Sequence, residues 1–469
     1  MKVLLINPMI NQAESLGRLK KFMTPMPSIG LAYIAAVLEK NGIKVKIVDD
    51  FFSRMGIGGI TERVKNEKPD IVGISCITPT ADQVFEIAKR IKAYKKDTII
   101  ILGNIHASIF AESILKEERV DVIVHGEGEY TMLELIKAIE GGKNLRGVKG
   151  ISFLEDGIMI HTPARPPIEN LDGLPFPAWH LYPHSKFRIL PFVEMKRPAL
   201  VISGSRGCPY KCTFCVKVME GGRRARSAKN IVDEFEWLAE NFGIKQVAFV
   251  DPIFPFGKKE GLEFCEEIVS RGVNKKVIWA TDTRVDLVDK ELLQKMKEAG
   301  CKRVMYGFET GAQMALDGLA KKFTLEDAKK AAEETKKAGI QSVGFFMLGM
   351  PGETKETAQR TIEFARELNI DFAKFTLTVP YPGTELYEIL LREGALNTND
   401  WSKFTPYTQD PESLAYVPDG MSGEELLAMQ KKAIFRFYMR PKIIFRHLFK
   451  IRTVTLRDML YGAYTLLSS

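Results

Sequence analysis

The first 140 residues alternate short aliphatic runs with segments of helical periodicity, and this pattern constrains the fold more than any other feature. The five runs are KVLLI at 2–6, KVKIVD at 44–49, DIVGIS at 70–75, TIIILG at 98–103 and DVIVHG at 121–126. Helical patterns such as residues 28–42 and 81–95 separate them. Nearly continuous aliphatic strands separated by helices form a parallel sheet that is covered on both faces. We therefore expect residues 1–150 to form a doubly wound, Rossmann-like α/β domain.

Small, polar and hydroxylated residues follow three of these runs. They are Ser75 and Thr78 after the third run, Gly103, Asn104 and His106 after the fourth, and Gly126, Glu127 and Gly128 after the fifth. Ligands of parallel sheets bind at the carboxyl ends of the strands, and small residues let the backbone approach a large ligand closely. Any one of these loops is equally consistent with ordinary turns and caps, with Ser75 and Thr78 as helix caps. Three such loops on one edge favour a bound ligand.

Three of the six cysteines lie close together in the segment SGSRGCPYKCTFC, residues 203–215. Cys208, Cys212 and Cys215 have the spacing C-x3-C-x2-C, which is one ligand short of a structural zinc site. A 4Fe–4S cluster held by three thiolates leaves one iron open, where a substrate or cofactor can coordinate. The other three cysteines are scattered, so we expect no disulfide framework and a reducing cytoplasm.

Two motifs of the first half resemble those of a known domain. GNIHAS at 103–108 is similar to a GG-x-H-x-S/T loop, with Asn104 in place of the second glycine, and VHGEGEYT at 124–131 is similar to V-x-GEGE-x-T. Both belong to the cobalamin-binding domain of one class of radical S-adenosylmethionine enzymes. The resemblance implies that the three loops above contact cobalamin. The D-x-H-x-x-G motif is absent, so His106 is expected at the corrin edge or nucleotide tail rather than on cobalt, with a capping role as the alternative.

The cysteine segment closely resembles the defining motif of the radical S-adenosylmethionine family. The resemblance implies one 4Fe–4S cluster on Cys208, Cys212 and Cys215, with its open iron chelated by the amino and carboxylate groups of S-adenosylmethionine. It also implies that Tyr210 and Phe214, the aromatic residues of the segment, lie beside S-adenosylmethionine.

A proline-rich stretch, placed at 151–197, reads as a linker, and strand–helix units resume after it. Its aromatic residues either line a cofactor cleft or pack between domains; they are Trp179, His180, Tyr182 and His184. Six aliphatic strands follow, as in the partial (β/α)6 barrel of the family, which we expect at 198–395 with its site at the carboxyl ends. The resemblance implies S-adenosylmethionine contacts from Asp251, Arg284, Glu309 and Gly349. A helix cap is the alternative for Asp251 and a surface ion pair for Arg284. Asp282 and the segment 380–384 also lie at strand ends.

The net charge is +8, and an excess of positive charge lies near the C-terminus, in the part 396–469 that we expect to be a helical basic domain. Residues 426–457 contain nine Lys and Arg but no Asp or Glu. In PKIIFRHLFK, cations at 442, 446 and 450 oppose an apolar face made by Ile444, Phe445, Leu448 and Phe449. Such a helix either contacts a membrane surface or acidic partner, or packs on the barrel with a solvated basic face. No nucleic-acid-binding module is recognisable, and no apolar run is long enough to span a membrane.

The resemblance implies an enzyme in which S-adenosylmethionine is cleaved at the cluster and the resulting radical removes hydrogen from a substrate carbon. We therefore expect a cobalamin-dependent C-methyltransferase that acts at an unactivated carbon of a lipid or other small apolar metabolite. Its reductant would be a low-potential donor such as flavodoxin or ferredoxin. We expect it in the cytoplasm, and at the inner face of the membrane if the basic helices bind lipid. A radical cyclase with the same cofactors is the alternative, and a cobalamin-binding regulator is the alternative from another class.

Overall fold

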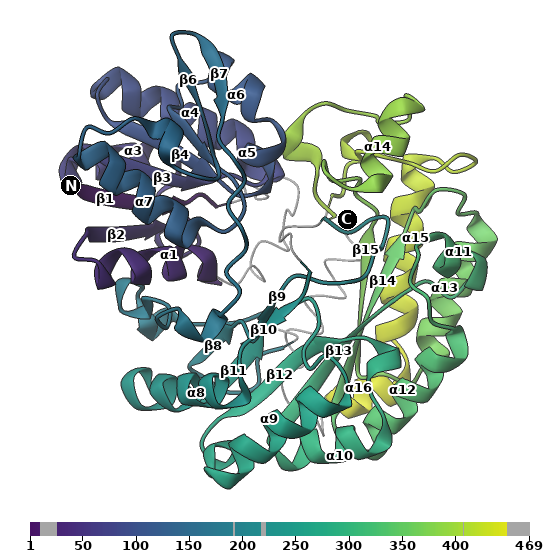
Figure 1. Cartoon of the computed structure of the whole chain (residues 1–469). Helices are drawn as coiled ribbons and strands as arrows, with labels where there is room; N and C mark the ends of the chain where they lie inside the picture. Colours follow the sequence, from purple (N-terminus) through teal and green to yellow (C-terminus); the bar gives the residue numbers. More distant parts are fainter. Residues whose placement is uncertain (10–25, 191–192, 217–221, 407, 448–469) are drawn as a thin grey trace.

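The computed structural model describes residues 1–9, 26–190, 193–216, 222–406 and 408–447, which form two α/β lobes side by side (Figure 1). The first lobe contains a seven-stranded sheet in the order β2-β1-β3-β4-β5-β6-β7. Its strands are β1 (Lys2–Asn7), β2 (Lys44–Asp49), β3 (Ile71–Ser75), β4 (Ile99–Gly103), β5 (Val122–Val124), β6 (Ile151–Glu155) and β7 (Ile158–His161). β1 to β5 are parallel, which confirms the doubly wound sheet expected from the aliphatic runs.

The hairpin of β6 and β7 differs from the expectation, because the sequence analysis placed its residues in the linker. β6 pairs antiparallel with β5, and Val122 lies opposite Phe153. Asp156 and Gly157 connect the two strands with positive φ angles of 51° and 77°. Positive φ at both turn residues is the geometry that matches the twist of a two-residue hairpin. The first sheet therefore continues past residue 150.

Helices cover both faces of this sheet. Val3 and Leu5 belong to a core with α1 (Ile29–Lys40) and α7 (Gly128–Glu140). Leu4 and Ile6 alternate to the other face, where the core includes α3 (Gly56–Glu67), α4 (Ala81–Tyr94) and α6 (Ala111–Glu117). Two short helices, α2 (Asp50–Ser53) and α5 (Ile105–Ile109), follow β2 and β4. The strand residues therefore serve two separate cores.

The aromatic residues of the linker pack between the lobes. Trp179, Tyr182 and Phe187 are buried in one core cluster that also contains Ala32 of α1 and Leu200 of the barrel. This arrangement supports interdomain packing for Trp179 and Tyr182. His180 and His184 lie near the surface, where His180 is within 3.0 Å of Glu39.

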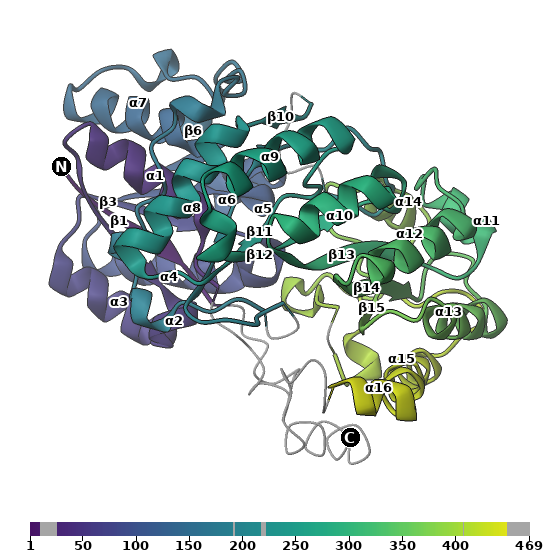
Figure 2. The same ribbon diagram turned by 90° about the horizontal axis from the view of Figure 1, so that it is seen from below.

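The second lobe is a six-stranded parallel sheet in the order β15-β14-β13-β12-β11-β8, curved into a partial barrel (Figures 1 and 2). Its strands are β8 (Ala199–Ile202), β11 (Gln246–Phe249), β12 (Ile278–Thr283), β13 (Cys301–Glu309), β14 (Gln341–Leu348) and β15 (Phe372–Leu377). The helices around it are α8 (Ala228–Phe242), α9 (Lys258–Ser270), α10 (Lys290–Glu298), α11 (Gln313–Gly318), α12 (Leu325–Lys337), α13 (Lys355–Glu367) and α14 (Glu385–Arg392). A small antiparallel pair, β9 (Ser205–Arg206) and β10 (Arg224–Ala225), flanks the cysteines. The expected α/β barrel fold is confirmed.

The described C-terminal helices pack on the barrel. They are α15 (Gly423–Tyr438) and α16 (Pro441–Phe445). Arg446 was expected on a solvated basic face, but its guanidinium lies 2.9 Å from the Asp371 carboxylate at the start of β15. Phe445, expected on the apolar face, is 57 % exposed. The rest of the expected amphipathic helix, Leu448, Phe449 and Lys450, lies outside the described residues.

No helix in the described ranges combines the length and apolarity that crossing a membrane requires.

Candidate active site between the two sheets

The carboxyl ends of the two sheets face each other, because residues that follow β5 contact residues that follow β8. Arg206 Nη1 donates a hydrogen bond to Glu127 Oε1 at 2.9 Å, and Arg206 Nη2 donates to Glu129 Oε1 at 2.5 Å. The same guanidinium lies over the ring of Tyr33, 5.2 Å from its centroid. One arginine of the barrel thus joins two glutamates of the first lobe.

Arg224 adds a second cation to this cluster. Its Nη1 lies 3.0 and 2.9 Å from the two carboxylate oxygens of Glu127. The four side chains are only 5 to 11 % exposed, and we call Glu127, Glu129, Arg206 and Arg224 the interlobe clamp. Burial opposes ionisation, but the hydrogen bonds from Arg224 and Arg206 hold the pKa of Glu127 below its ordinary value. Glu127 was expected at cobalamin, whereas its carboxylate is committed to the barrel, and the sequence analysis did not single out Glu129.

Asn104 and Ser75 lie together at the exposed edge of the first sheet. Asn104 has a φ of 82°, and its Nδ2 donates to Ser75 Oγ at 3.1 Å. Its Oδ1 accepts from the Ile105 backbone N–H at 2.7 Å, so Asn104 caps α5. With a ψ of 176°, Asn104 lies in a backbone region that is almost confined to glycine, so Asn in place of glycine is strained here and is held by these two hydrogen bonds.

The glycines of this edge are not equivalent. A Cβ at Gly126, where φ is 65°, would meet no atom within 4 Å, and at Gly103 the nearest atom would be Val124 O at 3.8 Å. At Gly128 a Cβ would lie 2.9 Å from Ile34 Cδ1. Gly103 and Gly126 therefore leave room for a large ligand at the sheet edge, whereas Gly128 allows α7 to pack on α1.

His106 and Thr78 are paired with each other inside the protein. His106 is 1 % exposed, and its Nδ1 lies 3.3 Å from Thr78 Oγ1. The imidazole packs against Phe110 and against Trp401 of the C-terminal part, with ring centroids 4.7 and 5.1 Å away. Burial lowers the pKa of His106 to about 4. Its neutral ring thus joins the first lobe to the C-terminal part, and the expected contact of His106 or Thr78 with cobalamin would require a rearrangement of this cluster.

The cysteine loop, which we define as residues 207–216, carries three free thiols. Cys208 and Cys212 are partly buried and Cys215 is exposed, and burial raises the pKa of Cys212 and Cys215. Among the described residues, no three His, Cys, Asp or Glu side chains are gathered closely enough to hold one metal ion. A 4Fe–4S cluster held by three thiolates leaves one iron open, whereas a structural zinc ion takes four protein ligands. The three-thiolate donor set of this loop therefore fits an iron–sulfur cluster.

The entry to this loop is fixed by its neighbours. Gly207 has a φ of 80°, and a Cβ there would overlap the carbonyl oxygen of Gly222. Asp251 accepts hydrogen bonds from Gly204 N at 2.9 Å and from Ser205 Oγ at 2.6 Å, one on each carboxylate oxygen. Burial raises the pKa of Asp251 to about 6. Asp251 therefore holds the strand that leads into the loop, and its contact with S-adenosylmethionine stays a prediction.

Arg284 braces the cysteine loop from β12. Its guanidinium lies over the ring of Tyr210, 3.7 Å from the centroid. It also makes two 2.9 Å hydrogen bonds to Asp286 and one of 2.5 Å to the backbone oxygen of Lys321. These contacts occupy much of the donor capacity of a buried guanidinium. Arg284, expected to contact S-adenosylmethionine, has a bracing role in this structure.

Glu309 and Lys321 form an ion pair beside the thiols. Glu309 Oε1 lies 2.7 Å from Lys321 Nζ, and both side chains are largely buried. Glu309 has a φ of 64°, and Ala320 and Lys322, which flank the lysine, both have φ of 56°. Left-handed backbone at residues other than glycine stores strain and concentrates at functional sites. Lys321 was not singled out from the sequence, although it lies in the segment YGFETGAQMALDGLAKK that carries Glu309.

Lys321 also reaches the aromatic residue of the motif. Its Nζ lies 5.6 Å from the ring centroid of Phe214. Burial is the main cause of the raised pKa of Cys212 and Cys215, and the positive charge of Lys321 opposes it in both. The structure thus brings Glu309, Phe214 and two of the cysteines to one place, as expected from the sequence.

Gly349 and Gly383 have packing roles. Gly349 follows β14 with a φ of 84°, and a Cβ there would lie 2.8 Å from Leu426 Cδ2 of α15. A Cβ at Gly383 would lie 2.7 Å from Ile109 Cδ1 of the first lobe. Gly349 therefore makes room for α15 on the side where a Cβ would point, and its contact with S-adenosylmethionine stays a prediction. The loop of Gly383 adds another interlobe contact.

Asp282 faces the inside of the barrel. On β12, Trp279 packs outward against Phe264 of α9, with centroids 5.2 Å apart, and Thr281 Oγ1 donates to Phe254 O at 2.5 Å. Side chains alternate along a strand, so Asp282 points to the opposite, interior face. Its carboxylate makes no hydrogen bond or ion pair within the described part of the chain, and it retains accessible surface. The contacts of the described residues thus leave the Asp282 carboxylate available to a ligand in the barrel interior.

Lys374 of β15 shares this interior. Its Nζ lies 5.7 Å from the ring centroid of Phe345 on β14. Burial raises the pKa of Asp282 to about 7, the Asp251 carboxylate adds to this effect, and the charge of Lys374 opposes it. The sequence analysis noted Asp282 at a strand end but gave no role to Lys374.

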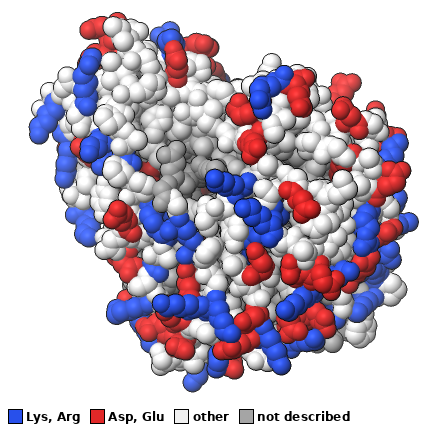
Figure 3. All heavy atoms as spheres, turned by 45° about the vertical axis from the view of Figure 1, so that its right-hand side comes forward, with Lys and Arg blue, Asp and Glu red and all other residues white. Residues whose placement is uncertain are grey.

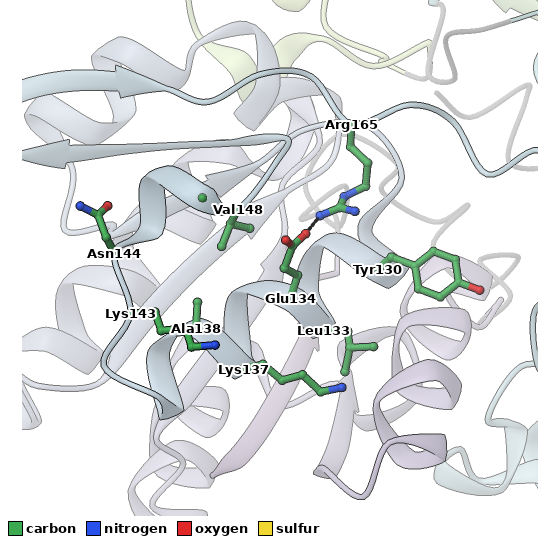
Figure 4. Close-up of a pocket in the computed structure, with 10 residues that line it drawn as sticks. Tyr130, Leu133, Glu134, Lys137, Ala138, Lys143, Asn144, Val148 and Arg165 are labelled. Carbon is green, nitrogen blue, oxygen red and sulfur yellow. Dashed lines mark hydrogen bonds and ion pairs between the residues drawn. The ribbon is translucent and has the colours of Figure 1, made fainter.

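A pocket on the outer face of α7 lies away from both edges (Figure 4). It is lined by Tyr130, Leu133, Glu134, Lys137, Ala138, Lys143, Asn144, Gly147, Val148 and Arg165. None of these residues belongs to the loops that follow β3, β4 or β5 or to the cysteine loop. On the face shown in Figure 3, acidic and basic side chains are interspersed. The chemistry is therefore placed at the facing edges and not at this pocket.

Two family models match the chain. The radical SAM superfamily matches residues 202–365, and the B12 binding domain matches residues 17–136. An uncharacterized methyltransferase of Pyrococcus horikoshii is 32 % identical over 96 % of this chain and 95 % of its own length. An anaerobic magnesium-protoporphyrin IX monomethyl ester cyclase of Rubrivivax gelatinosus is 32 % identical over 95 % of this chain and 78 % of its own.

A similar fold occurs in the radical S-adenosylmethionine methyltransferase TsrM of Kitasatospora setae, solved with cobalamin and a 4Fe–4S cluster. Its TM-score is 0.71 at 19 % identity, over 94 % of this chain and 89 % of that one. The matched domains coincide with the edge of small residues and with the cysteine loop. The chain therefore belongs to the cobalamin-binding radical S-adenosylmethionine enzymes, whose cofactors are a 4Fe–4S cluster, S-adenosylmethionine and cobalamin.

Proposed function

We propose that this enzyme is a C-methyltransferase that acts at an unactivated carbon of a small, mainly apolar metabolite or lipid. The observation that carries the proposal is the opposition of the two carboxyl edges across the interlobe clamp. A methyl donor on one edge and a hydrogen-abstracting centre on the other would then share one substrate. The similarity to a methyltransferase over almost the whole chain supports this reading.

Cys208, Cys212 and Cys215 would hold the cluster, and the open edge at Gly103 and Gly126 would receive cobalamin. When bound, the cluster with S-adenosylmethionine supplies the radical that removes hydrogen, and cobalamin supplies the methyl group. In this proposal Glu309, Tyr210 and Phe214 lie next to S-adenosylmethionine. The chain orients these groups and excludes water from the space between the lobes.

Asp282 and Lys374 are the polar groups that we assign to the substrate. The neighbouring residues that alternate into the barrel include Ala280, Met305 and Phe345, which are apolar. Pockets for small molecules are mostly apolar, with a few polar groups that fix the orientation of the ligand. A substrate with an apolar body and one polar group fits this combination.

The electron donor and the membrane are proposed partners. A low-potential donor such as flavodoxin or ferredoxin would reduce the cluster, which approaches the surface at the exposed Cys215. Membrane contact would depend on residues after His447, because Arg446 is held by Asp371.

The test supplies S-adenosylmethionine with a deuterated methyl group, a low-potential reductant and cobalamin to the reconstituted enzyme with a metabolite or lipid extract of its source. A methyltransferase forms S-adenosylhomocysteine and 5′-deoxyadenosine in comparable amounts, and mass spectrometry finds the label on a carbon of the product. Replacement of Asp282 with Asn should abolish labelling while uncoupled cleavage of S-adenosylmethionine persists.

A radical cyclase is the second candidate, supported by the similarity to a cyclase over most of the chain. It would consume its substrate and form 5′-deoxyadenosine without matching S-adenosylhomocysteine and without transfer of label. That result would replace the methyltransferase proposal.

A further inference from the structure

We propose that the interlobe clamp positions the cysteine loop relative to the cobalamin edge, so that one buried ion-pair cluster sets the separation of the two cofactors. The inference rests on the assignment of cobalamin to the first sheet and of the cluster to the cysteine loop. It goes beyond that assignment, because it gives Glu127 and Glu129 a positioning role that does not depend on direct contact with either cofactor.

The clamp is attached close to both cofactor sites. Arg206 lies two residues before Cys208, and Glu127 follows Gly126 directly. A displacement of the carboxylates would therefore be transmitted to a cluster ligand over a single intervening residue, Gly207.

On the barrel side of the clamp, the backbone that carries Arg206 has little freedom to move. Arg206 pairs with Arg224 in the β9–β10 ladder, and Asp251 holds the preceding Ser205. Gly207 is fixed against the Gly222 carbonyl. The guanidinium of Arg206 is therefore rigidly connected to the start of the cysteine loop.

The first lobe holds the carboxylates equally firmly. Gly128, between the two glutamates, packs against Ile34 of α1. Glu127 Oε2 also accepts the Ile168 backbone N–H at 2.6 Å. Removal of one partner would leave a buried charge without compensation, which makes such a cluster a sensitive determinant of geometry.

Besides a 3.5 Å hydrogen bond from Arg226 Nη1 to Tyr33 Oη, two further interlobe contacts are of a different kind. Ile109 lies beside the loop of Gly383, and His106 and Phe110 pack on Trp401. These contacts are apolar or aromatic and do not specify direction, whereas the two-pronged fork of Arg206 does. They can hold the lobes together when the clamp is weakened, so a clamp variant should still fold.

The chain offers a matched control. Glu194 is 6 % exposed and, like Glu127, it pairs with two arginines, Arg188 and Arg197, each at 2.6 Å. All three control residues lie between 188 and 197, so this cluster does not reach the first lobe. Glu194→Gln therefore removes a buried charge of the same type without touching the clamp.

The experiment measures the distance between the cluster and cobalt by pulsed dipolar electron paramagnetic resonance, in reconstituted holoenzyme reduced so that both centres are paramagnetic. We expect a single narrow distance distribution in the wild type and in Glu194→Gln. In Glu127→Gln the distribution should shift or broaden, although iron and cobalamin contents stay at wild-type levels. Glu129→Gln changes only one hydrogen bond of the clamp and should give a smaller change in the distance distribution. It replaces Glu127→Gln in the experiment if that variant is unstable.

A kinetic readout complements the distance. A misplacement of about 1 Å can lower a rate on the order of 100-fold, so methyl transfer should fall by that factor in Glu127→Gln. Uncoupled cleavage of S-adenosylmethionine needs only the barrel side and should stay near the wild-type rate. Arg206→Lys keeps the positive charge but loses the two parallel hydrogen bonds of the guanidinium. This variant should therefore also lose the narrow distance distribution and most of the methyl transfer.

Two results would overturn different parts of the argument. Loaded clamp variants whose distance distributions match the wild type would refute the positioning role. Absence of bound cobalamin or of any cluster–cobalt coupling in the wild type would instead refute the cofactor assignment on which the inference rests.

Discussion

Outside the interlobe clamp, the residues at the cobalamin edge of the first lobe are small and uncharged, whereas the cluster edge of the barrel contains several buried charged side chains. Gly126 has open space around it, and Asn104 and Ser75 make one neutral hydrogen bond. On the barrel, Arg284 and Lys321 are each held in several contacts.

This difference follows from what each edge would hold. A large cofactor is accommodated by the absence of side chains, because bulk at the sheet edge would exclude it. A compact charged centre with S-adenosylmethionine needs polar groups that are already oriented, since reorganisation during the reaction is costly. The comparison teaches that the first edge is specified by shape and the second by preorganised charge.

The largest effect is expected from the cysteines of the cluster edge. Replacement of Cys208, Cys212 and Cys215 by Ala should remove all cluster iron, because each thiolate binds its own iron. An iron assay and the thiolate-to-iron absorption of anaerobically reconstituted protein provide the measurement. Cobalamin binding should persist, since its edge lies on the other lobe. Cys265→Ala is the control, and a full cluster in the triple variant would contradict the assignment.

The next effect concerns the charge of the cluster edge. Lys321→Met leaves Glu309 buried without its partner, which should cost about 3–5 kcal/mol of unfolding free energy. Glu309→Gln added to it removes the unpaired charge and should restore much of the loss in a double-mutant cycle. Denaturant unfolding gives these values. On the cobalamin edge, Asn104→Ala loses two neutral hydrogen bonds, with Ser75 Oγ and with the Ile105 N–H, and should cost only about 1–2 kcal/mol. Equal losses at the two positions would remove the contrast between the edges.

The sequence predicts the strands and the cysteine loop because both signals are local. Aliphatic runs report burial within a few residues, and the three thiols lie on one short segment. The hairpin of β6 and β7 was missed although Asp156 and Gly157 between alternating residues are a hairpin signal. The proline density that follows them outweighed that signal.

The contacts that the polar residues make could not be predicted from the sequence. Glu127 and Arg206 are 79 positions apart, and Asp251 is 47 positions from Gly204. A carboxylate that braces a loop and one that binds a cofactor have the same local sequence. Only the fold distinguishes Asp251, whose oxygens accept hydrogen bonds, from Asp282, whose oxygens have no partner among the residues that the structure describes.

A smaller effect is expected when one glycine from each edge is replaced by Ala and the losses of stability are compared. Gly207→Ala adds a side chain in left-handed backbone, about 1–2 kcal/mol, and an overlap with a carbonyl, about 1–3 kcal/mol. Gly126→Ala adds only the first cost, because nothing lies near its Cβ. Thermal unfolding should therefore show the larger loss for Gly207→Ala. Cobalamin affinity should fall only for Gly126→Ala, and reversal of either order would contradict the placement of the two sites.

The smallest effect tests the neutral interior behind the cobalamin edge. Burial lowers the pKa of His106 to about 4, below the value of about 6.5 in an unfolded chain. The unfolded state then binds a proton more readily than the folded state, so the stability falls as the pH decreases from about 6.5 toward 4. The loss is about 1 kcal/mol at pH 5.5 and about 3 kcal/mol below pH 4. His106→Gln cannot titrate, so between pH 7.5 and 5.5 the wild type should lose about 1 kcal/mol more than this variant. Subtracting the pH profile of the variant from that of the wild type removes the contribution of buried acids such as Asp251 and Asp282. Their raised pKa values change the stability with pH in the opposite direction. Parallel pH profiles for wild type and His106→Gln would show that the imidazole is open to solvent, and the shape-specified edge would then contain a titrating group after all.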